Sequence, residues 1–238
     1  MRGSRKIGYS NILDLDQFFF MVQDQAYVIV KLVDFPNYYS GGDIDIFCYD
    51  IDLFAKQLLG VGNRYIDQGF EIEVLRRDEG QTYIDFYLDG ELEFRFDLYQ
   101  KLPRYKNINV KEQLIYSLIE NGVPKPRSSE GNKYFLFVPS ITDDLILRYI
   151  EYIEWYRRRP DKIKHLEYIK KMVTDNPSRI GFLDKLHIYT DLPKLERRRT
   201  ILNGFYPFRW ATFWYKRFRS LSWRRILNYL RRRFSFKH

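Results

Sequence analysis

Apolar and polar residues recur along the chain with two different periods, which predict mostly strands in the first half and mostly helices in the second. Apolar residues three or four positions apart predict a helix over residues 12–25. Runs of β-branched and apolar residues predict strands over 27–33 and 44–49, and the Gly- and Pro-containing segment 34–42 between them is expected to be a loop. A further helix is expected over 53–59.

Three strands with a clear alternation follow at 70–76, 82–88 and 91–99, and we expect them to pair antiparallel. The dipeptide Asp89-Gly90 between the last two is typical of a two-residue hairpin turn. The apolar residues of the last strand all fall on one face, so that face is expected to lie against the core, with the polar face turned away from it.

From residue 110 onward the pattern becomes mainly helical. The elements that it predicts are helices over 110–121, 141–159, 161–173 and 180–189 and a short strand over 133–138. The expected fold class is therefore α+β, with a mixed β-sheet core, a helical C-terminal half and a basic amphipathic helical tail. We expect the parts to be a sheet-containing core at 1–108, a mainly helical domain at 109–204 and the tail at 205–238.

The charge of the chain is concentrated at its end. The 238 residues include 40 Lys and Arg and 31 Asp and Glu, a formal net charge of +9. Segment 205–238 is rich in Arg and aromatic residues and contains no Asp or Glu, so the rest of the chain is close to neutral. No apolar run approaches the roughly 20 residues of a spanning helix, and no signal peptide is expected. A single cysteine excludes a disulfide framework and favours a reducing, cytosolic setting.

The segment 40–46 reads Ser-Gly-Gly-Asp-Ile-Asp-Ile and is the strongest candidate for chemistry. Residues two apart on a strand share a face, so Asp43 and Asp45 project side by side after a glycine-rich turn. Adjacent carboxylates repel each other, and a divalent cation such as Mg²⁺ offsets that repulsion. Glycines let a backbone approach a phosphate closely. The pattern indicates metal-assisted transfer of a phosphorus-containing group.

A third carboxylate on a neighbouring strand would complete such a site, and two residues compete for the position. Asp97 and Asp85 each lie between apolar neighbours on a predicted strand. We favour Asp97, because the polar face of its strand also carries Arg95, a cation suited to phosphate. Asp85 stays the alternative.

These residues resemble the nucleotidyltransferase-fold superfamily, which includes the DNA polymerase β-like proteins. The resemblance rests on Gly-Gly-Asp-Ile-Asp-Ile at 41–46 followed by an isolated Asp on a later strand. Bacterial members linked to surface-polysaccharide biosynthesis are similar in further segments. Those segments are Tyr-Val-Ile-Val-Lys at 27–31, Val-Pro-Ser at 138–140 and Lys-His-Leu-Glu-Tyr-Ile at 164–169.

The resemblance implies an enzyme that uses Mg²⁺ or Mn²⁺, held by Asp43, Asp45 and Asp97. Asp97 would also help to deprotonate the attacking hydroxyl. The donor would be a nucleoside triphosphate or another activated nucleotide, and the acceptor a sugar or glycolipid precursor. The residues expected near the phosphates are Ser40, Gly41, Gly42, Lys31, Lys164 and His165.

The chain departs from the superfamily pattern in one element. A Gly-Ser or Gly-Gly pair usually stands about a dozen residues before the Asp-x-Asp, whereas residues 31–34 contain no glycine. Either Lys31 supplies a point charge instead, or the donor is not an ordinary nucleoside triphosphate.

Plainer interpretations of the same residues stay open. Gly-Gly-Asp is also ordinary turn chemistry, and a relative of the fold can have lost its activity. Lys164 and His165 also fit a solvated helix face. Asp50 and Asp52 are expected to cap the next helix, with Asp52 directly before it, and Cys48 is expected in the core.

The tail, 205–238, alternates aromatic and basic residues and predicts two short amphipathic helices. Such helices suit an anionic membrane surface, which places the protein in the cytoplasm, peripherally on the inner face of the plasma membrane. Arg-rich aromatic segments also bind nucleic acid, but the neutral charge of the rest of the chain makes an RNA substrate the less favoured partner. A protein partner and a non-catalytic membrane-associated role are the further alternatives.

Overall fold

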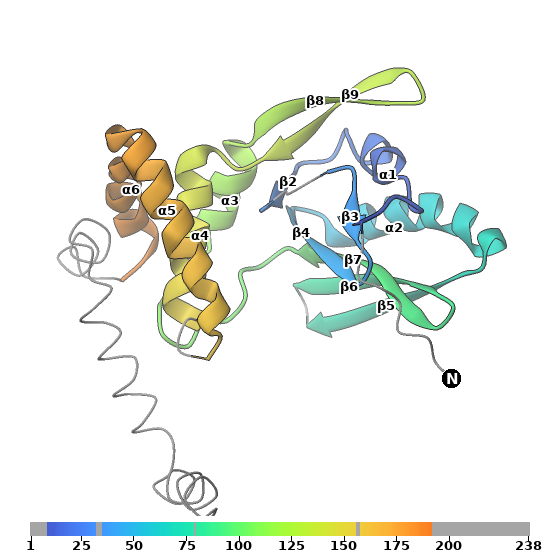
Figure 1. The fold of residues 1–238 in the computed structure, drawn as a ribbon, viewed down its shortest axis with the longest axis horizontal. Helices are drawn as coiled ribbons and strands as arrows, with labels where there is room; N and C mark the ends of the chain where they lie inside the picture. The colour runs from blue at the N-terminus through green and yellow to red at the C-terminus, as the bar shows by residue number, and fades with distance from the viewer. Residues whose placement is uncertain (1–8, 32–34, 79, 156–157, 192–238) are drawn as a thin grey trace, which may run out of the picture. The chain divides into compact units, whose positions relative to one another are not determined.

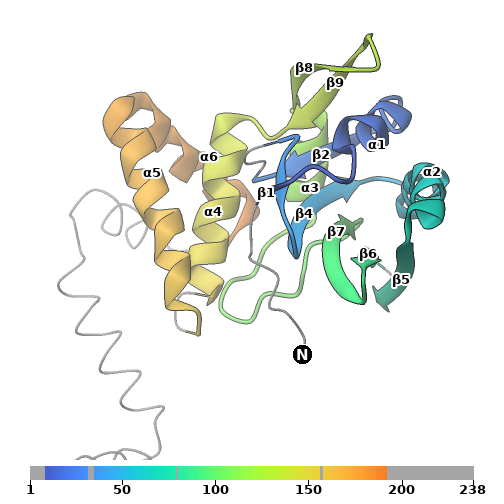
Figure 2. The ribbon, with the colours of Figure 1, turned by 45° about the vertical axis from the view of Figure 1, so that its right-hand side comes forward.

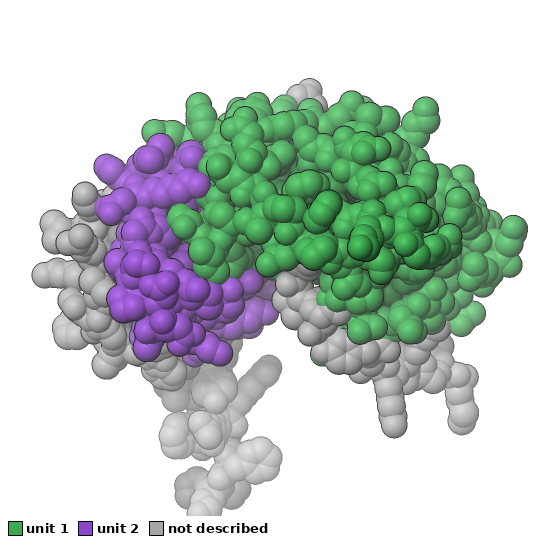
Figure 3. Space-filling model, turned by 90° about the horizontal axis from the view of Figure 1, so that it is seen from above, with its two compact units in different colours: residues 1–104, 110–144 green, residues 105–109, 145–238 purple. Residues whose placement is uncertain are grey.

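The computed structural model describes residues 9–31, 35–78, 80–155 and 158–191. The chain divides into two compact units, one formed by residues 1–104 and 110–144 and the other by 105–109 and 145–238 (Figure 3). The predicted tail, 205–238, lies outside the described residues. The described chain mixes helices and strands, which confirms the α+β class.

A five-stranded mixed sheet forms the centre of the first unit (Figures 1 and 2). Its strands, in spatial order, are β2 (Tyr27–Val30), β4 (Gly42–Cys48), β7 (Glu91–Tyr99), β6 (Gln81–Leu88) and β5 (Phe70–Asp78). Strands β4 and β7 run parallel, and the other neighbours run antiparallel. The mixed sheet and the antiparallel pairing of the three later strands are therefore confirmed.

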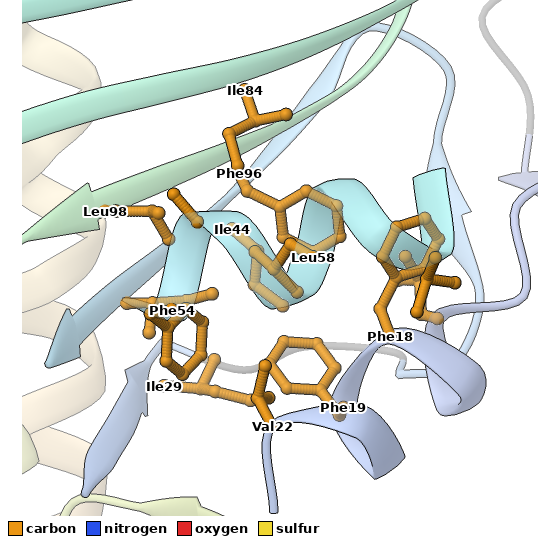
Figure 4. Packing of buried hydrophobic residues seen from close by; sticks show 14 of the residues in the cluster. Phe18, Phe19, Val22, Ile29, Ile44, Phe54, Leu58, Ile84, Phe96 and Leu98 are labelled. Carbon is orange, nitrogen blue, oxygen red and sulfur yellow. The ribbon is translucent and has the colours of Figure 1, made fainter. Parts of the chain in front are cut away.

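Helices α1 (Leu15–Met21) and α2 (Ile51–Gly62) cover one face of this sheet, followed by a 3₁₀ segment at Asn63–Gln68. Figure 4 shows their apolar side chains meeting those of the strands in one core. Labelled members of this core are Phe18, Phe19, Val22, Ile29, Ile44, Phe54, Leu58, Ile84, Phe96 and Leu98. Removing such side chains from water is the dominant favourable contribution to folding, and it decides which face of each strand points inward.

Cys48 lies in this core, as predicted. Its side chain is buried on the same face of β4 as Ile44 and Ile46. Burial raises the pKa of the Cys48 thiol to about 12, so the thiol stays protonated at neutral pH.

The prediction that Asp52 stands directly before the second helix and caps it is wrong. Asp50 is the N-cap, and its side chain accepts a hydrogen bond of 2.9 Å from the backbone N–H of Leu53. The helix therefore starts at Ile51, and Asp52 lies in its first turn, paired with Arg76. Both aspartates suit the N-terminus of a helix, so the sequence alone did not separate them.

Two short pairings were not predicted. Strand β3 (Tyr38–Tyr39) pairs with β1 (Tyr9–Ser10) inside the segment that we expected to be a loop. Strand β8 (Val123–Ser129) forms a hairpin with β9 (Asn132–Val138), although it contains two prolines. In a strand, the backbone N–H groups of residues two apart point to the same edge. A strand that pairs along one edge only can therefore hold prolines at 124 and 126, because both missing N–H groups can belong to the unpaired edge.

Helix α3 (Gln113–Glu120) belongs to the first unit and contacts β2 and β4. Helix α4 (Ile141–Trp155) begins in the first unit and continues into the second, which also holds α5 (Ile163–Asp175) and α6 (Phe182–Tyr189). Short 3₁₀ segments at Pro160–Lys162 and Pro177–Gly181 precede the last two helices. Among the described residues, no helix has both the length and the apolar character required to cross a bilayer.

The turn before β4 requires glycine for steric reasons. Gly41 has φ +78°, a region that favours glycine, and a Cβ on Gly42 would lie 2.7 Å from the backbone oxygen of Tyr39. We expect Gly42→Ala to destabilise the full chain by about 1–3 kcal/mol in urea unfolding.

The matched control is Gly60→Ala in α2, where an added Cβ meets nothing within 4 Å. Alanine there should leave stability unchanged or raise it by up to about 1 kcal/mol. Equal effects of the two substitutions would contradict the assigned crowding at Gly42.

Candidate functional site

The polar residues of β4, β7 and β6 form two rows on the sheet face opposite the α1–α2 core. Partners in register share a face, so the pairings identify the rows directly. The first row contains Asp45, Asp97 and Tyr83, and the second contains Asp43, Arg95 and Asp85. The structure thus places three predicted carboxylates, Asp43, Asp45 and Asp97, on adjacent strands of one face.

Asp45 and Asp97 are direct neighbours across the parallel β4–β7 pair. Asp45 forms an ion pair with Lys31, whose Nζ atom lies 2.9 Å from Asp45 Oδ2. Lys31 follows β2 and has φ +57°, a conformation uncommon for a residue other than glycine. Lys31 therefore compensates Asp45 from the neighbouring strand, as a point charge close to the Asp-x-Asp pair.

Asp97 lacks comparable compensation. Its side chain is 10% exposed, and its Oδ1 atom is buried and accepts no hydrogen bond in the described part of the chain. Arg95 Nε lies 3.8 Å from that atom, and the Tyr99 hydroxyl lies 3.5 Å from Oδ2. Burial first, and then the charges of Asp45 and Asp43, raise the pKa of Asp97 to about 7.

Asp85, the alternative third carboxylate, lies in the other row and is bound to Arg95. Arg95 donates from Nε to Asp85 Oδ1 and from Nη2 to Asp85 Oδ2, each at 2.6 Å. Asp85 is fully buried. This bidentate pair compensates the buried carboxylate of Asp85. Among the described cations, Asp97, beside Asp45, has only the more distant contact of 3.8 Å with Arg95.

The glycine turn is attached to β7 by Glu93, a residue that the sequence analysis missed. Glu93 is buried, and its carboxylate accepts hydrogen bonds from the hydroxyls of Ser10 and Ser40, the latter at 2.7 Å. Its backbone oxygen accepts a 2.8 Å hydrogen bond from Gly41 N–H. The donors of Ser40 and Gly41 are thus already used within the chain.

A β-bulge explains how Glu93 reaches this position. Phe86 pairs with Phe94 whereas Tyr87 pairs with Leu92, so Glu93 is the extra residue on β7. One signal was available in the sequence. A two-residue turn at 89–90 places each odd-numbered residue of one strand opposite an even-numbered residue of the other. The polar residues of both strands, however, are odd-numbered. They can share one face of the sheet only if one strand contains an extra residue.

Lys164 and His165 lie on α5 and belong to the second unit, whereas the three carboxylates belong to the first. Lys164 is exposed, whereas His165 is buried with its Nε2 atom 3.1 Å from Glu151 Oε2. Lys162 Nζ lies 2.8 Å from the same Glu151 oxygen. His165 is therefore part of an internal contact between α4 and α5.

In the part of the chain that the structure describes, no group of three or more His, Cys, Asp and Glu side chains is arranged to hold a metal ion by itself. The adjacent Asp45 and Asp97 nevertheless fit Mg²⁺, which typically uses one or two carboxylates and takes its other ligands from water and substrate phosphates. The buried, unbonded Oδ1 atom of Asp97 is the observation that supports this fit.

Comparisons of the chain with protein-family models, with curated proteins and with solved structures give no match.

The raised pKa of Asp97 makes stability depend on pH. The folded chain binds the Asp97 proton more tightly than the unfolded chain. The contribution of Asp97 to the free energy of unfolding is therefore fully present at low pH and is lost as the pH rises toward and through 7. Between pH 5 and pH 8, without metal, the loss should be roughly 2–3 kcal/mol. Asp97→Asn should abolish it in urea unfolding at the two pH values with EDTA.

The control is Asp67→Asn, which changes an exposed carboxylate in the 3₁₀ segment and should leave the pH dependence of the wild type intact. If the unfolding free energy of Asp97→Asn declined with pH as steeply as that of the wild type, the assigned electrostatics would be contradicted.

Proposed function

We propose that this chain is a Mg²⁺- or Mn²⁺-dependent nucleotidyltransferase, or transfers a closely related phosphoryl group. The observation that carries the proposal is the pairing of Asp45 with Asp97, two adjacent carboxylates of which one is buried, with a pKa raised to about 7. Burying such a pair is unfavourable unless a ligand compensates it, and a divalent cation is the simplest compensating ligand.

Asp45 and Asp97 would hold the ion, with Asp43 beside them at the start of β4. When bound, the ion supplies charge neutralisation for phosphate oxygens and lowers the barrier to attack on phosphorus. The turn at 40–42 fixes where β4 begins and thus where Asp43 and Asp45 point. The mixed sheet with Asp-x-Asp on one strand and an Asp on the parallel neighbour also supports the resemblance to the nucleotidyltransferase fold.

Asp97 is the residue suited to receive the proton of an attacking hydroxyl. Its Oδ1 atom carries no hydrogen bond from the described residues. Without metal the pKa of Asp97 is raised to about 7, close to the working pH that suits a general base, and a bound cation would lower this pKa. As the resemblance implies, Asp97 would serve both as a metal ligand and as the base.

The proposed acceptor rests on the resemblance, and the proposed location rests on the tail. A sugar or glycolipid precursor fits the bacterial proteins that the chain resembles, which are linked to surface polysaccharides. Segment 205–238 would hold the enzyme on the anionic inner face of the plasma membrane. The donor would be a nucleoside triphosphate or another activated nucleotide. RNA is the alternative partner of the tail.

The carboxylate pair gives the first test of this function. In a thermal-shift titration with Mg²⁺ and Mn²⁺, the wild type should gain stability, because ligands that bind the native state raise the melting temperature. Asp45→Asn and Asp97→Asn should each lose most of this gain. With a screened donor and acceptor, their turnover should fall on the order of 10²-fold or more.

Asp67→Asn serves again as the control and should keep the full response to the metals. Full turnover in Asp45→Asn, or a wild type whose melting temperature ignores both ions, would refute the proposed metal role.

The tail is tested separately in the full-length chain. Changing Arg231, Arg232 and Arg233 to Gln should weaken flotation with phosphatidylserine-containing vesicles by roughly 10²-fold, since each basic residue near an anionic surface contributes about 1 kcal/mol. The control, Lys164→Gln with Lys171→Gln, changes exposed lysines of α5 and should bind like the wild type. Binding to RNA but not to vesicles would overturn the membrane assignment.

A further inference from the structure

The glycine turn at 40–42 offers fewer phosphate donors than its sequence indicates. Ser40 donates its hydroxyl hydrogen to Glu93, and Gly41 donates its backbone hydrogen to the Glu93 carbonyl. Both bonds are internal to the first unit, and Glu93 is buried. A phosphate that relied on these two donors would have to break bonds that hold the turn against β7, so another group of the same face is the better candidate.

Arg95 meets the requirements for such a group. Its guanidinium is fixed by the two 2.6 Å hydrogen bonds to buried Asp85 and lies over the ring of Tyr83, 4.6 Å from the ring centroid. A guanidinium fixed in this way loses little further freedom when it binds an oxyanion.

One edge of the Arg95 guanidinium is unused. Asp85 takes hydrogen bonds from Nε and Nη2, and among the residues that the structure describes none accepts a hydrogen bond from Nη1. The side chain is 27% exposed, and Nε lies 3.8 Å from Asp97 Oδ1. The unused donors therefore belong to the guanidinium whose Nε atom lies beside the carboxylate proposed to hold the metal.

We propose that Arg95 binds a phosphate oxyanion of the substrate through Nη1, with Asp85 and Tyr83 as positioning residues for its guanidinium. The identification of the ligand as a phosphate rests on the proposed function. In this chain, phosphate recognition thus moves from the turn at 40–42 to a side chain of β7, opposite Asp43 in the register.

Local charge decides the conditions of the test. Four carboxylates (Asp43, Asp45, Asp85 and Asp97) stand against two cations (Lys31 and Arg95), so without metal the face repels an anion. Binding is therefore measured by calorimetry in two arms. One arm uses the wild type with saturating Mg²⁺. The other uses the double variant Asp45→Asn/Asp97→Asn in EDTA, which removes two negative charges without any metal.

Pyrophosphate is the first probe and represents the polyphosphate of a donor. Glucose 1-phosphate is the second and represents a phosphorylated sugar acceptor. We expect Arg95→Lys to weaken binding of the preferred probe at least about tenfold in both arms, because lysine keeps the charge but loses the bidentate bond and the planar geometry.

The matched control is Arg127→Lys. Arg127 also makes a bidentate pair, with Asp16 at 3.0 and 2.9 Å, and its guanidinium lies 5.0 Å from the ring centroid of Phe35. These partners are not residues of the proposed site, so the variant should bind both probes like the parent. Should Arg95→Lys fail to fold, Arg95→Gln with Asp85→Asn removes both charges together and avoids an unpaired buried carboxylate.

The outcomes separate this inference from the proposed function. In one outcome, the melting temperature of the wild type does not respond to Mg²⁺, yet probe binding in the EDTA arm depends on Arg95. This outcome would support the inference and overturn the proposed function. A normal Mg²⁺ response with probe affinity unchanged in Arg95→Lys would overturn the inference alone. Absence of probe binding in both arms would also overturn it.

Discussion

The parallel pairing of β4 with β7 is the constraint on which the site depends. Because Ile44, Phe96 and their neighbours are buried under α1 and α2, the residues between them must point to the opposite face. The register then brings Asp45 and Asp97 together whatever their charges. Core packing thus holds two like charges side by side, and the resulting repulsion, added to burial, raises the pKa of Asp97.

The cations of this face are divided unequally between its carboxylates. Lys31 lies beside Asp45 and Arg95 binds Asp85, which leaves Asp97 buried and only weakly compensated. Strongly perturbed pKa values cluster at functional sites, so the raised pKa of Asp97 is consistent with the proposed ligand site. The bulge at Glu93 contributes to the same arrangement, because Glu93 holds the glycine turn on β7 and uses the donors of Ser40 and Gly41.

The alternation of residues in the sequence predicted the sheet and the face on which the carboxylates lie. It did not predict that Asp85 would be bound by Arg95, because that pairing depends on one extra residue at Glu93. Strand β8 was missed because Pro124 and Pro126 argue against a strand, and they are tolerated in a hairpin that pairs on one side. Burial of His165 depends on how α5 packs against α4, and the local pattern carried no information on that contact.

The most direct measurement of the central claim is the titration of the Asp97 carboxyl carbon by NMR, in the full-length chain, with and without Mg²⁺. The account predicts a midpoint near 7 without metal and a lower midpoint when Mg²⁺ is added, because a cation favours the charged carboxylate. A midpoint near the ordinary value of about 4, unchanged by Mg²⁺, would contradict it.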